Sequence, residues 1–323
     1  MTMKILIIKL GYSETLDPGI GKVASLGDVL RTTPILWAVK EKFPDSHISW
    51  LVSENAEPLL RGNQFIDRIL VWDEFVPFQL MREKVDVLIN LEKIPGVAAL
   101  SDMIDAWTKY GFRFDGNNGT YHSYERGLDF MEYIERKKNG QTVGDYWQKV
   151  LVEMLGVQWN GQPCIIGYTS KTTELFDIGL NFQVGAKWPT KAMPLDDWKK
   201  LEELLKEKGF TVSWQQGLGD LYEYIDWINS CKSVITQDSL GLHIALALKK
   251  KVIGLFGPTD PQEVYLYGCG QIVYPKQKCD SMPCYSPTCR SGLKCMESMD
   301  LNRIITAVFG HELERVDAPG EDL

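Results

Sequence analysis

A group of polar residues directly follows an apolar run in the C-terminal half of the chain. Asp238 and Ser239 end a β-branched run that begins at Val234, and a segment with helical apolar spacing follows and contains His243. In open α/β sheets, ligands bind at the carboxyl ends of the strands. A helix that begins near Ser239 would direct backbone N–H groups and its positive dipole end at an anion such as a phosphate. The alternative is that Asp238 and Ser239 only cap this helix, as Asp and Ser often do.

Two more charged residues precede segments that read as helices. Asp28 comes after the apolar run Lys4–Lys9 and a loop rich in Gly and Pro. Lys191 comes just before Met193–Trp198, the start of a predicted helix, where its ammonium group can neutralise an anionic ligand as a point charge. The alternatives are a helix cap for Asp28 and a surface position for Lys191, with Lys187 competing for the anion.

Four evenly spaced cysteines mark a loop near the C-terminus: Cys279, Cys284, Cys289 and Cys295. Four thiolates on a loop that contains Pro and Gly suit a tetrahedral metal site, most often of zinc. Because the protein would fill all four coordination positions, such a metal would be structural and not catalytic. The alternative is a loop of reduced thiols.

Length and composition narrow the class of protein. A chain of 323 residues is too long for one typical domain and suggests two. The net charge of −8 argues against a general nucleic-acid binder, which would carry a basic patch or stripe. The apolar run near the N-terminus is too short for a signal peptide, and no stretch approaches the roughly 18 apolar residues of a membrane span. We therefore expect a cytoplasmic protein.

Strands and helices are expected to alternate along the chain, which predicts parallel sheets with right-handed crossovers. Apolar or β-branched runs predict strands at Lys4–Lys9, His47–Val52, Arg68–Trp72, Val85–Asn90, Leu180–Val184, Phe210–Trp214 and from Val234. Helical spacing predicts helices from about Asp28 to Val39, at Tyr146–Leu155, at Asp196–Lys208 and at Leu221–Cys231. The region from Ile94 to about Gly140 is less regular, and we expect an excursion or an acceptor-facing lobe there.

Four segments in this order resemble glycosyltransferase family 9, the heptosyltransferases of the lipopolysaccharide inner core. They are Lys4–Lys9 with Ser25–Pro34, Lys187–Trp198, Asp238–His243 and Phe256–Asp260. The resemblance covers nearly the whole chain and is weakest between Ile94 and Gly140. It implies the α/β GT-B fold, in which two Rossmann-like domains with parallel sheets face each other. Residues 1–165 would form the acceptor-side domain, and residues 166–323 the nucleotide-sugar domain with the Cys-rich loop.

The resemblance also implies inverting, metal-independent transfer of a sugar from a nucleotide diphosphate. Such a reaction needs a base for the acceptor hydroxyl and positive groups for the departing diphosphate. Asp28 matches the base of the family, and Lys191 matches its phosphate-contacting lysine. Asp238 would hold sugar hydroxyls, while Ser239 and nearby backbone amides would contact the diphosphate. His243 would donate to a phosphate oxygen; its alternative is a histidine at the edge of the core.

The remaining candidates are small residues beside these positions. On the acceptor side, Ser25 is a candidate for an acceptor contact, and Gly27 permits close backbone approach or an unusual turn. On the donor side, the chain departs from the Asp-Ser-Gly-x-x-His pattern of the family, because Leu240 replaces the glycine and Gly241 follows it. We expect this change to affect the shape of the donor turn.

Two further features of the chain are departures from the common pattern of the family. Gly11–Ala24 reads as an insertion at the edge of the cleft; it lacks the spacing of a phosphate loop. The cysteine quartet resembles the four-cysteine iron finger of relatives that modify autotransporter adhesins, so iron is an alternative to zinc.

The sequence therefore predicts a family 9 glycosyltransferase that uses ADP-heptose or a similar nucleotide-sugar. The acceptor would be a glycolipid of the lipopolysaccharide core or another glycan, with peripheral contact to the inner membrane as an option and no nucleic-acid partner. Catalysis would need no cofactor. The alternatives are another GT-B nucleotide-sugar enzyme such as an epimerase, a heptosyltransferase that modifies autotransporters, and a catalytically silent binding protein.

Overall fold

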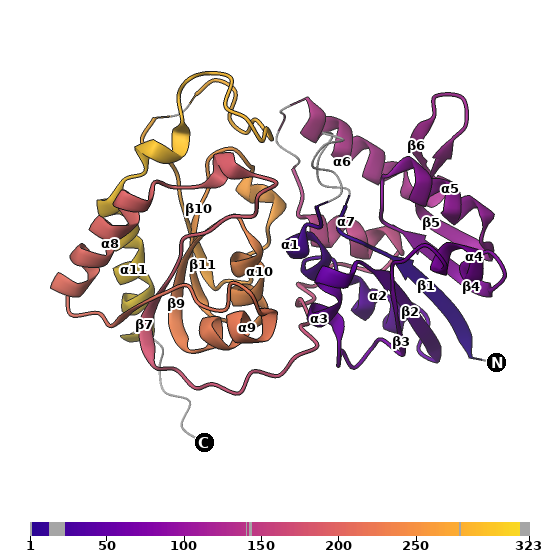
Figure 1. Ribbon diagram of the computed structural model, residues 1–323, viewed down its shortest axis with the longest axis horizontal. Coiled ribbons are helices and arrows are strands. Elements are labelled where there is room, and N and C mark those ends of the chain that lie inside the picture. The colour runs from indigo at the N-terminus through magenta and orange to yellow at the C-terminus, as the bar shows by residue number, and fades with distance from the viewer. Residues whose placement is uncertain (1, 13–22, 140, 142–143, 278, 317–323) are drawn as a thin grey trace. The chain divides into compact units, whose positions relative to one another are not determined.

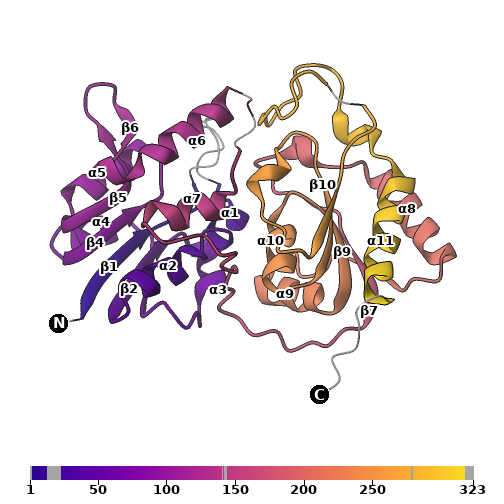
Figure 2. The ribbon, with the colours of Figure 1, turned by 180° about the vertical axis from the view of Figure 1, so that it is seen from behind.

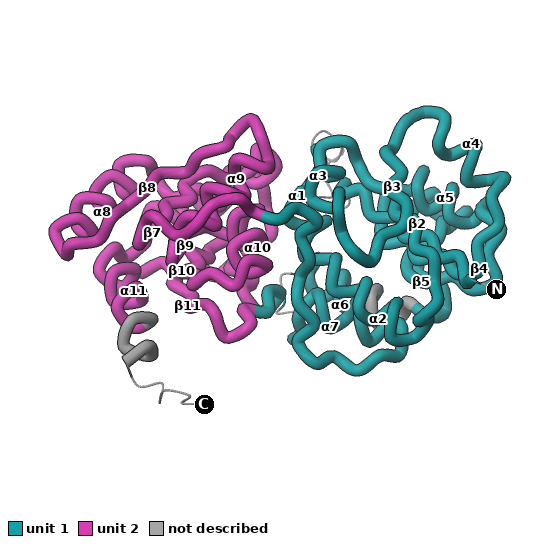
Figure 3. Tube along the Cα trace, turned by 90° about the horizontal axis from the view of Figure 1, so that it is seen from below, with its two compact units in different colours: residues 1–169, 262–265 teal, residues 170–261, 266–323 magenta. Residues whose placement is uncertain are grey.

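The computed structural model describes residues 2–12, 23–139, 141, 144–277 and 279–316. The chain divides into two compact units, coloured separately in Figure 3. Unit 1 comprises Met1–Thr169 and Gln262–Tyr265, and unit 2 comprises Ser170–Pro261 and Leu266–Leu323. The short stretch Gln262–Tyr265 of the C-terminal half thus belongs to unit 1. The acceptor-side and donor-side roles of the two halves stay predictions.

Unit 1 is built on a six-stranded sheet with the order β3-β2-β1-β4-β5-β6 (Figure 1). Neighbouring strands are parallel except for β5 and β6, which pair antiparallel. The strands are β1 (Met3–Ile8), β2 (Ser46–Val52), β3 (Arg68–Val71), β4 (Lys84–Asn90), β5 (Asp105–Asp115) and β6 (Thr120–Ser123). The helices are α1 (Leu26–Leu30), α2 (Ile35–Lys42), α3 (Glu57–Leu60), α4 (Val76–Leu80), α5 (Pro95–Met103), α6 (Leu128–Lys138) and α7 (Trp147–Met154).

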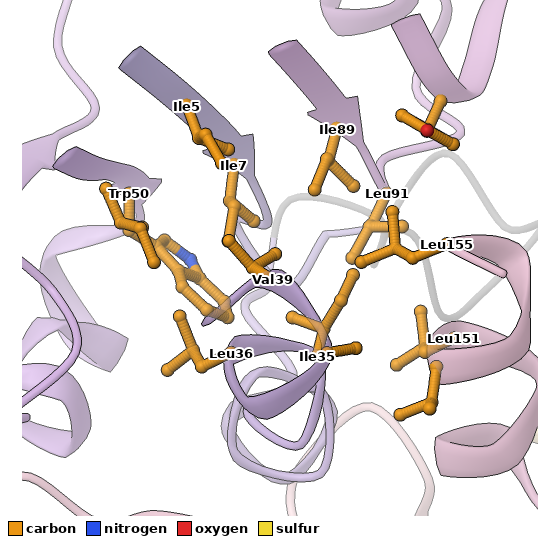
Figure 4. Packing of buried hydrophobic residues seen from close by; sticks show 14 of the residues in the cluster. Ile5, Ile7, Ile35, Leu36, Val39, Trp50, Ile89, Leu91, Leu151 and Leu155 are labelled. Atoms are coloured by element: carbon orange, nitrogen blue, oxygen red, sulfur yellow. The ribbon is translucent and has the colours of Figure 1, made fainter. Parts of the chain in front are cut away.

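Both faces of this sheet are covered, which explains why its central strand is almost entirely apolar. Ile5 and Ile7 of β1 pack in one buried cluster with side chains of α2 and α7, as Figure 4 shows. Leu6 and Ile8 of the same strand pack in a second cluster with side chains of α4 and α5. Because successive strand residues point to opposite faces, one short run serves two cores. Charged residues at the end of such a strand are therefore held by a rigid frame.

Unit 2 contains a five-stranded sheet with the order β11-β10-β9-β7-β8, and its paired strands are all parallel. The strands are β7 (Phe176–Asn181), β8 (Val212–Trp214), β9 (Cys231–Gln237), β10 (Lys251–Leu255) and β11 (Gly270–Val273). The helices are α8 (Leu195–Glu207), α9 (Leu221–Asn229), α10 (Leu240–Ala247) and α11 (Leu301–Val316). Side chains of α8 and α11 share one buried cluster with the sheet, whereas α9 and α10 contact β9 and each other (Figure 2). The predicted α/β class with parallel sheets is confirmed.

Two local expectations differ from the structure. The predicted helix from Asp28 to Val39 is two helices, α1 and α2. The hydroxyls of Thr32 and Thr33 donate to backbone carbonyl oxygens of α1, and Pro34 has no N–H group to continue the helix. The region after Ile94 is also more regular than expected and contains α5, β5, β6 and α6.

No helix among the described residues is long and apolar enough to cross a membrane. Of the predicted insertion Gly11–Ala24, residues 13–22 lie outside the described residues.

Candidate active site

Asp28 is a buried carboxylate in the first helix of unit 1. It lies within α1 and is 2% exposed. Its Oδ1 accepts a hydrogen bond from Nε of Arg31 at 3.0 Å, and its Oδ2 forms an ion pair with the ammonium group of Lys9. Ser25, not Asp28, holds the N-cap position of α1, so the helix-cap alternative does not describe Asp28. Its ion pairs indicate an ionised carboxylate, the form that can accept a proton.

Lys9 connects Asp28 to a second buried carboxylate. Lys9 is 1% exposed, and its Nζ lies 3.7 Å from Oε1 of Glu92. The same oxygen accepts the backbone N–H groups of Leu10 at 2.7 Å and Gly11 at 2.6 Å. Glu92 therefore fixes both the lysine and the chain that leaves β1.

Arg31 is held in turn by Glu263, which belongs to the short C-terminal stretch of unit 1. The Oε2 atom of Glu263 lies 3.4 Å from Nη1 of Arg31 and 3.0 Å from Nζ of Lys137. The guanidinium of Arg31 also lies over the ring of Trp147, 5.7 Å from its centroid. A charged network thus surrounds the Asp28 helix.

A pocket in unit 1 adjoins this network. It is lined by Lys9, Arg31, Leu91, Lys93, Phe112, Tyr133, Ile134, Lys137 and Trp147. Ammonium and guanidinium groups line this pocket beside aromatic rings.

The two small acceptor-side candidates have backbone roles. The N–H of Ser25 donates to the carbonyl of Gly11 at 2.7 Å, which closes the loop after β1. Gly27 lies inside α1 and is buried there. The unusual turn expected at Gly27 falls on Gly11 instead, whose φ of 94° lies in the left-handed region.

In unit 2, the predicted donor residues Lys191 and Asp238 form an ion pair. Nζ of Lys191 lies 2.6 Å from Oδ2 of Asp238, and the hydroxyl of Thr259 donates to the same oxygen at 2.8 Å. Asp238 follows β9, Thr259 follows β10, and Lys191 ends a short 3-10 helix, Pro189–Lys191, after β7. The structure therefore gathers these residues at the carboxyl ends of three adjacent parallel strands, where α/β sheets bind ligands.

His243 lies close to this ion pair but is buried. It is 4% exposed within α10, and its Nε2 lies 4.0 Å from Oδ1 of Asp238, too far for a hydrogen bond. Its phosphate contact stays a prediction. Lys187, the competitor of Lys191, is also buried, at 4% exposed.

Ser239 is the N-cap residue of α10, yet its side chain makes no capping hydrogen bond. Its Oγ instead accepts a hydrogen bond from Nδ2 of Asn181 at 3.0 Å. The side chain of Asp238 is engaged by Lys191 and Thr259. The alternative, in which Asp238 and Ser239 only cap α10, therefore does not explain the hydrogen bonds that these two side chains make.

Gly241 lies in the predicted donor-binding turn, where close packing leaves no room for a side chain. A Cβ atom at this position would lie 2.4 Å from Nδ2 of Asn181 and 2.4 Å from the hydroxyl of Tyr224. The glycine that packs against these groups thus stands one residue later than in the family pattern, and Leu240 occupies the earlier position.

The four-cysteine metal site stays a prediction. Among the residues that the structure describes, no group of three or more His, Cys, Asp or Glu side chains could hold a metal ion. Cys295 is buried, and burial raises its pKa to about 11. Cys289 is exposed, and a hydrogen bond with the Ser291 hydroxyl lowers its pKa. Interaction with the thiolates of Cys279, Cys284 and Cys289 also raises the pKa of Cys295, so the four thiols lie near one another, and binding of a metal by them stays a prediction.

Several residues of the two clusters were not predicted as site residues: Lys9, Arg31, Glu92, Asn181, Thr259 and Glu263. Lys9 stands at the end of a predicted strand, which is a usable signal. Asn181 and Thr259 stand at or after the ends of the observed strands β7 and β10. Glu92 lies two residues after the predicted strand Val85–Asn90 and carries a similar signal, whereas Glu263 does not follow a strand directly.

Comparison with known proteins points to one family. Residues 217–294 match glycosyltransferase family 9 (heptosyltransferase). Lipopolysaccharide heptosyltransferase 1 of Pseudomonas aeruginosa is 23% identical over 325 residues, which cover 83% of this chain and 86% of that protein. Lipooligosaccharide heptosyltransferase 2 of Haemophilus influenzae is 30% identical over 111 residues, which cover 26% of this chain and 32% of that protein.

Solved structures agree on the fold. The Escherichia coli heptosyltransferase WaaC with ADP superposes with a TM-score of 0.63 at 14% identity, covering 96% of this chain and 99% of that one. The iron-containing dodecameric glycosyltransferase TibC of enterotoxigenic E. coli gives a TM-score of 0.59 at 12% identity, covering 97% and 78%. The two Rossmann-like units are therefore those of a GT-B fold. The chain is a glycosyltransferase that is similar to the heptosyltransferases of family 9.

Proposed function

We propose that this chain transfers a heptose or related sugar from a nucleotide diphosphate to a hydroxyl of a lipopolysaccharide-core or similar glycan acceptor. The observation that carries the proposal is the group of Lys191, Asp238 and Thr259 at the carboxyl ends of adjacent strands, beside the start of α10. ADP is present in the WaaC structure, and ADP-D-β-D-heptose in a TibC complex. We therefore propose ADP-heptose as the donor.

The proposed reaction inverts the anomeric carbon in one displacement. The acceptor oxygen forms a bond to the anomeric carbon while the bond from that carbon to the diphosphate oxygen breaks. The hydroxyl proton passes to the carboxylate of Asp28, and the nucleoside diphosphate leaves with the bonding electron pair. An ionised carboxylate has about four acceptor sites, so the contacts with Lys9 and Arg31 are compatible with an additional bond from the hydroxyl.

Unit 2 would supply the donor half of this chemistry. An ammonium group has three N–H donors, so Lys191 can keep its bond to Asp238 and still contact the departing diphosphate. Its positive charge, with the backbone amides at the start of α10, would stabilise the leaving group without a metal ion. Asp238 would accept hydrogen bonds from the sugar hydroxyls, while Ser239 and His243 would donate to phosphate oxygens.

Unit 1 would supply the acceptor half. Asp28 is the proposed base, and the pocket lined by Arg31, Lys93 and Trp147 provides charge and a ring surface for the acceptor. Ser25 is proposed to contact the acceptor near Asp28. If that acceptor is a glycolipid, the protein would work at the inner surface of the cytoplasmic membrane as a peripheral protein.

Calorimetry with ADP-, GDP- and UDP-sugars tests the donor half. We expect one nucleotide class to bind wild-type protein, and Lys191→Met to weaken that binding about ten- to a hundredfold, since a charged hydrogen bond is lost. The matched control is Lys199→Met, which removes an exposed lysine of α8 that pairs only locally with Asp196. An unchanged donor affinity in Lys191→Met, or equal losses in both variants, would refute the assignment.

A second readout separates this proposal from its alternatives. Turnover of the donor only when an acceptor is present supports transfer. Hydrolysis of the donor without any acceptor would favour an epimerase-like enzyme. Donor binding without turnover, unaltered in Asp28→Ala, would favour a silent binding protein.

A further inference from the structure

Asn181 is a fully buried amide at the last position of β7, next to the start of α10. It is 0% exposed, and its side chain makes three hydrogen bonds. Its Nδ2 lies 2.7 Å from Oγ1 of Thr236 and 3.0 Å from Oγ of Ser239, and its Oδ1 lies 2.5 Å from the hydroxyl of Tyr224. Such a residue can fix the direction of the hydrogen bonds around it.

The neighbours of Asn181 determine which way its amide points. The hydroxyl of Thr236 donates to the carbonyl of Gln237 at 2.8 Å, so its single proton is already used. The Asn181 atom that faces Thr236 must therefore be the donor, Nδ2. Its acceptor Oδ1 then faces Tyr224, which can donate because burial raises the pKa of its phenol and keeps it protonated.

This orientation decides the role of the Ser239 hydroxyl. Because Nδ2 of Asn181 donates to Ser239 Oγ, that oxygen is an acceptor in this contact, and its own proton must point elsewhere. The other described contact of this hydroxyl is Oγ1 of Thr236, 3.4 Å away at the outer limit of a hydrogen bond. The proton is thus available to a ligand at the start of α10.

We propose that Asn181 is a positioning residue that makes the Ser239 hydroxyl a hydrogen-bond donor to the diphosphate of the bound nucleotide-sugar. The inference rests on the proposed function, in which the diphosphate lies at the start of α10. A serine hydroxyl can either donate or accept a hydrogen bond. The contact with Asn181 therefore selects the donor role of Ser239 at the start of α10.

Gly241 belongs to the same arrangement. Any Cβ at this position would meet both Nδ2 of Asn181 and the hydroxyl of Tyr224 at 2.4 Å. Glycine at 241 therefore leaves the space that the amide and the phenol need. This accounts for a glycine here, although the family pattern places one at the position of Leu240.

Binding measurements with neutral variants test the proposal. The probes are whichever of ADP, GDP and UDP binds wild-type protein best, and its nucleoside without phosphates. We expect Asn181→Leu to weaken diphosphate binding about three- to tenfold, because a neutral hydrogen bond is worth about one kcal/mol, and to leave nucleoside binding unchanged. In a Ser239→Ala background, Asn181→Leu should have no further effect on diphosphate binding, since the hydroxyl that it orients is absent.

Two variants that keep the shape of their side chains guard against a folding defect. Thr236→Val removes the acceptor that fixes the amide and should weaken diphosphate binding a few-fold. Tyr224→Phe leaves the contact with Thr236 intact and should bind within about twofold of wild type. Thermal unfolding of each variant shows whether the fold is retained.

The inference fails if Asn181→Leu and Thr236→Val bind the diphosphate like wild type. It also fails if diphosphate and nucleoside binding fall together, or if the effect persists fully in the Ser239→Ala background, because a packing defect would do the same. If wild-type protein binds none of the three diphosphates, the proposed function itself fails, a result that these variants cannot produce.

Discussion

At the scale of residues, the candidate site consists of charged groups that are buried and paired. Asp28 is held by Lys9 and Arg31, and Lys191 is held by Asp238. Removing one partner of a buried pair leaves the other charge uncompensated, so the two partners must be retained together. Such pairs would hold the proposed base and the proposed phosphate-binding lysine in fixed positions before a substrate binds, which is how preorganised sites reduce the cost of binding.

The cysteines of the C-terminal loop provide a prediction at the same scale. We expect iodoacetamide at neutral pH to modify Cys289 first, because it is exposed and a hydrogen bond from Ser291 lowers its pKa. Cys295 and Cys231 should react at least about tenfold more slowly, since burial raises the pKa of each to about 11. Peptide mass spectrometry over a time course measures these rates, with Cys289→Ser as the control.

The contrary result would concern metal binding. Joint protection of Cys279, Cys284, Cys289 and Cys295, together with stoichiometric zinc or iron in the purified protein, would contradict this order of reactivity and support the predicted metal site.

At the scale of elements, the strands that carry the site were largely predictable from the sequence. The runs that became β1, β2 and β4 are apolar because both faces of their sheet are covered. The predicted strand Leu180–Val184 is instead Phe176–Asn181, a run that includes Gly179. That glycine looks like a break in sequence, yet a Cβ there would lie 2.7 Å from Sγ of Cys231, so close packing requires it.

Other elements could not be predicted, because they depend on pairing with segments that are distant in the sequence. The strand β5 contains Asp, Thr, Lys, Gly and Arg residues and only short apolar stretches, so it shows no clear period. Its identity as a strand comes from pairing with β4 and β6, which local sequence does not report. The same limit applies to Glu263, which joins the site through partners that are distant in the sequence.

The strands of unit 2 give a stability prediction at this scale. Asp177 of β7 accepts hydrogen bonds from the N–H and hydroxyl of Thr211 and from Lys232 of β9. The ion pair with Lys232, followed by the bonds from Thr211, lowers the pKa of Asp177 to about 2. A lowered pKa stabilises the folded state above the unfolded value of about 4, and this stabilisation disappears as the pH falls through the folded value.

We therefore expect Asp177→Asn to lower the free energy of unfolding at pH 7 by about 1 kcal/mol, after a discount for partial exposure. The difference from wild type should shrink as the pH falls from about 4 toward 2. Urea denaturation across this range measures it. A difference that is zero at pH 7, or that grows in acid, would show that the carboxylate is not held as described.

At the scale of the whole molecule, the proposed chemistry uses residues of two units, and the chain passes between these units three times. The chain passes from unit 1 to unit 2 after Thr169, and Gln262–Tyr265 returns to unit 1 within the C-terminal half. Thr259 therefore donates to Asp238 in unit 2, while Glu263, four residues later in the sequence, pairs with Arg31 beside Asp28 in unit 1. In the proposed reaction, unit 1 supplies the base for the acceptor and unit 2 supplies the positive group for the leaving diphosphate.

The most direct test is the turnover of Asp28→Asn with ADP-heptose and a lipopolysaccharide-core acceptor. Because a general base contributes about a hundredfold or more, kcat should fall by at least that factor. Donor affinity should stay within about twofold of wild type, since Asp28 is not proposed to contact the donor. The control is Asp67→Asn, because the Asp67 carboxylate of unit 1 accepts a hydrogen bond from the backbone N–H of Ile48 in β2; this variant should keep near-normal turnover. A kcat for Asp28→Asn within about threefold of wild type would contradict its role as the base.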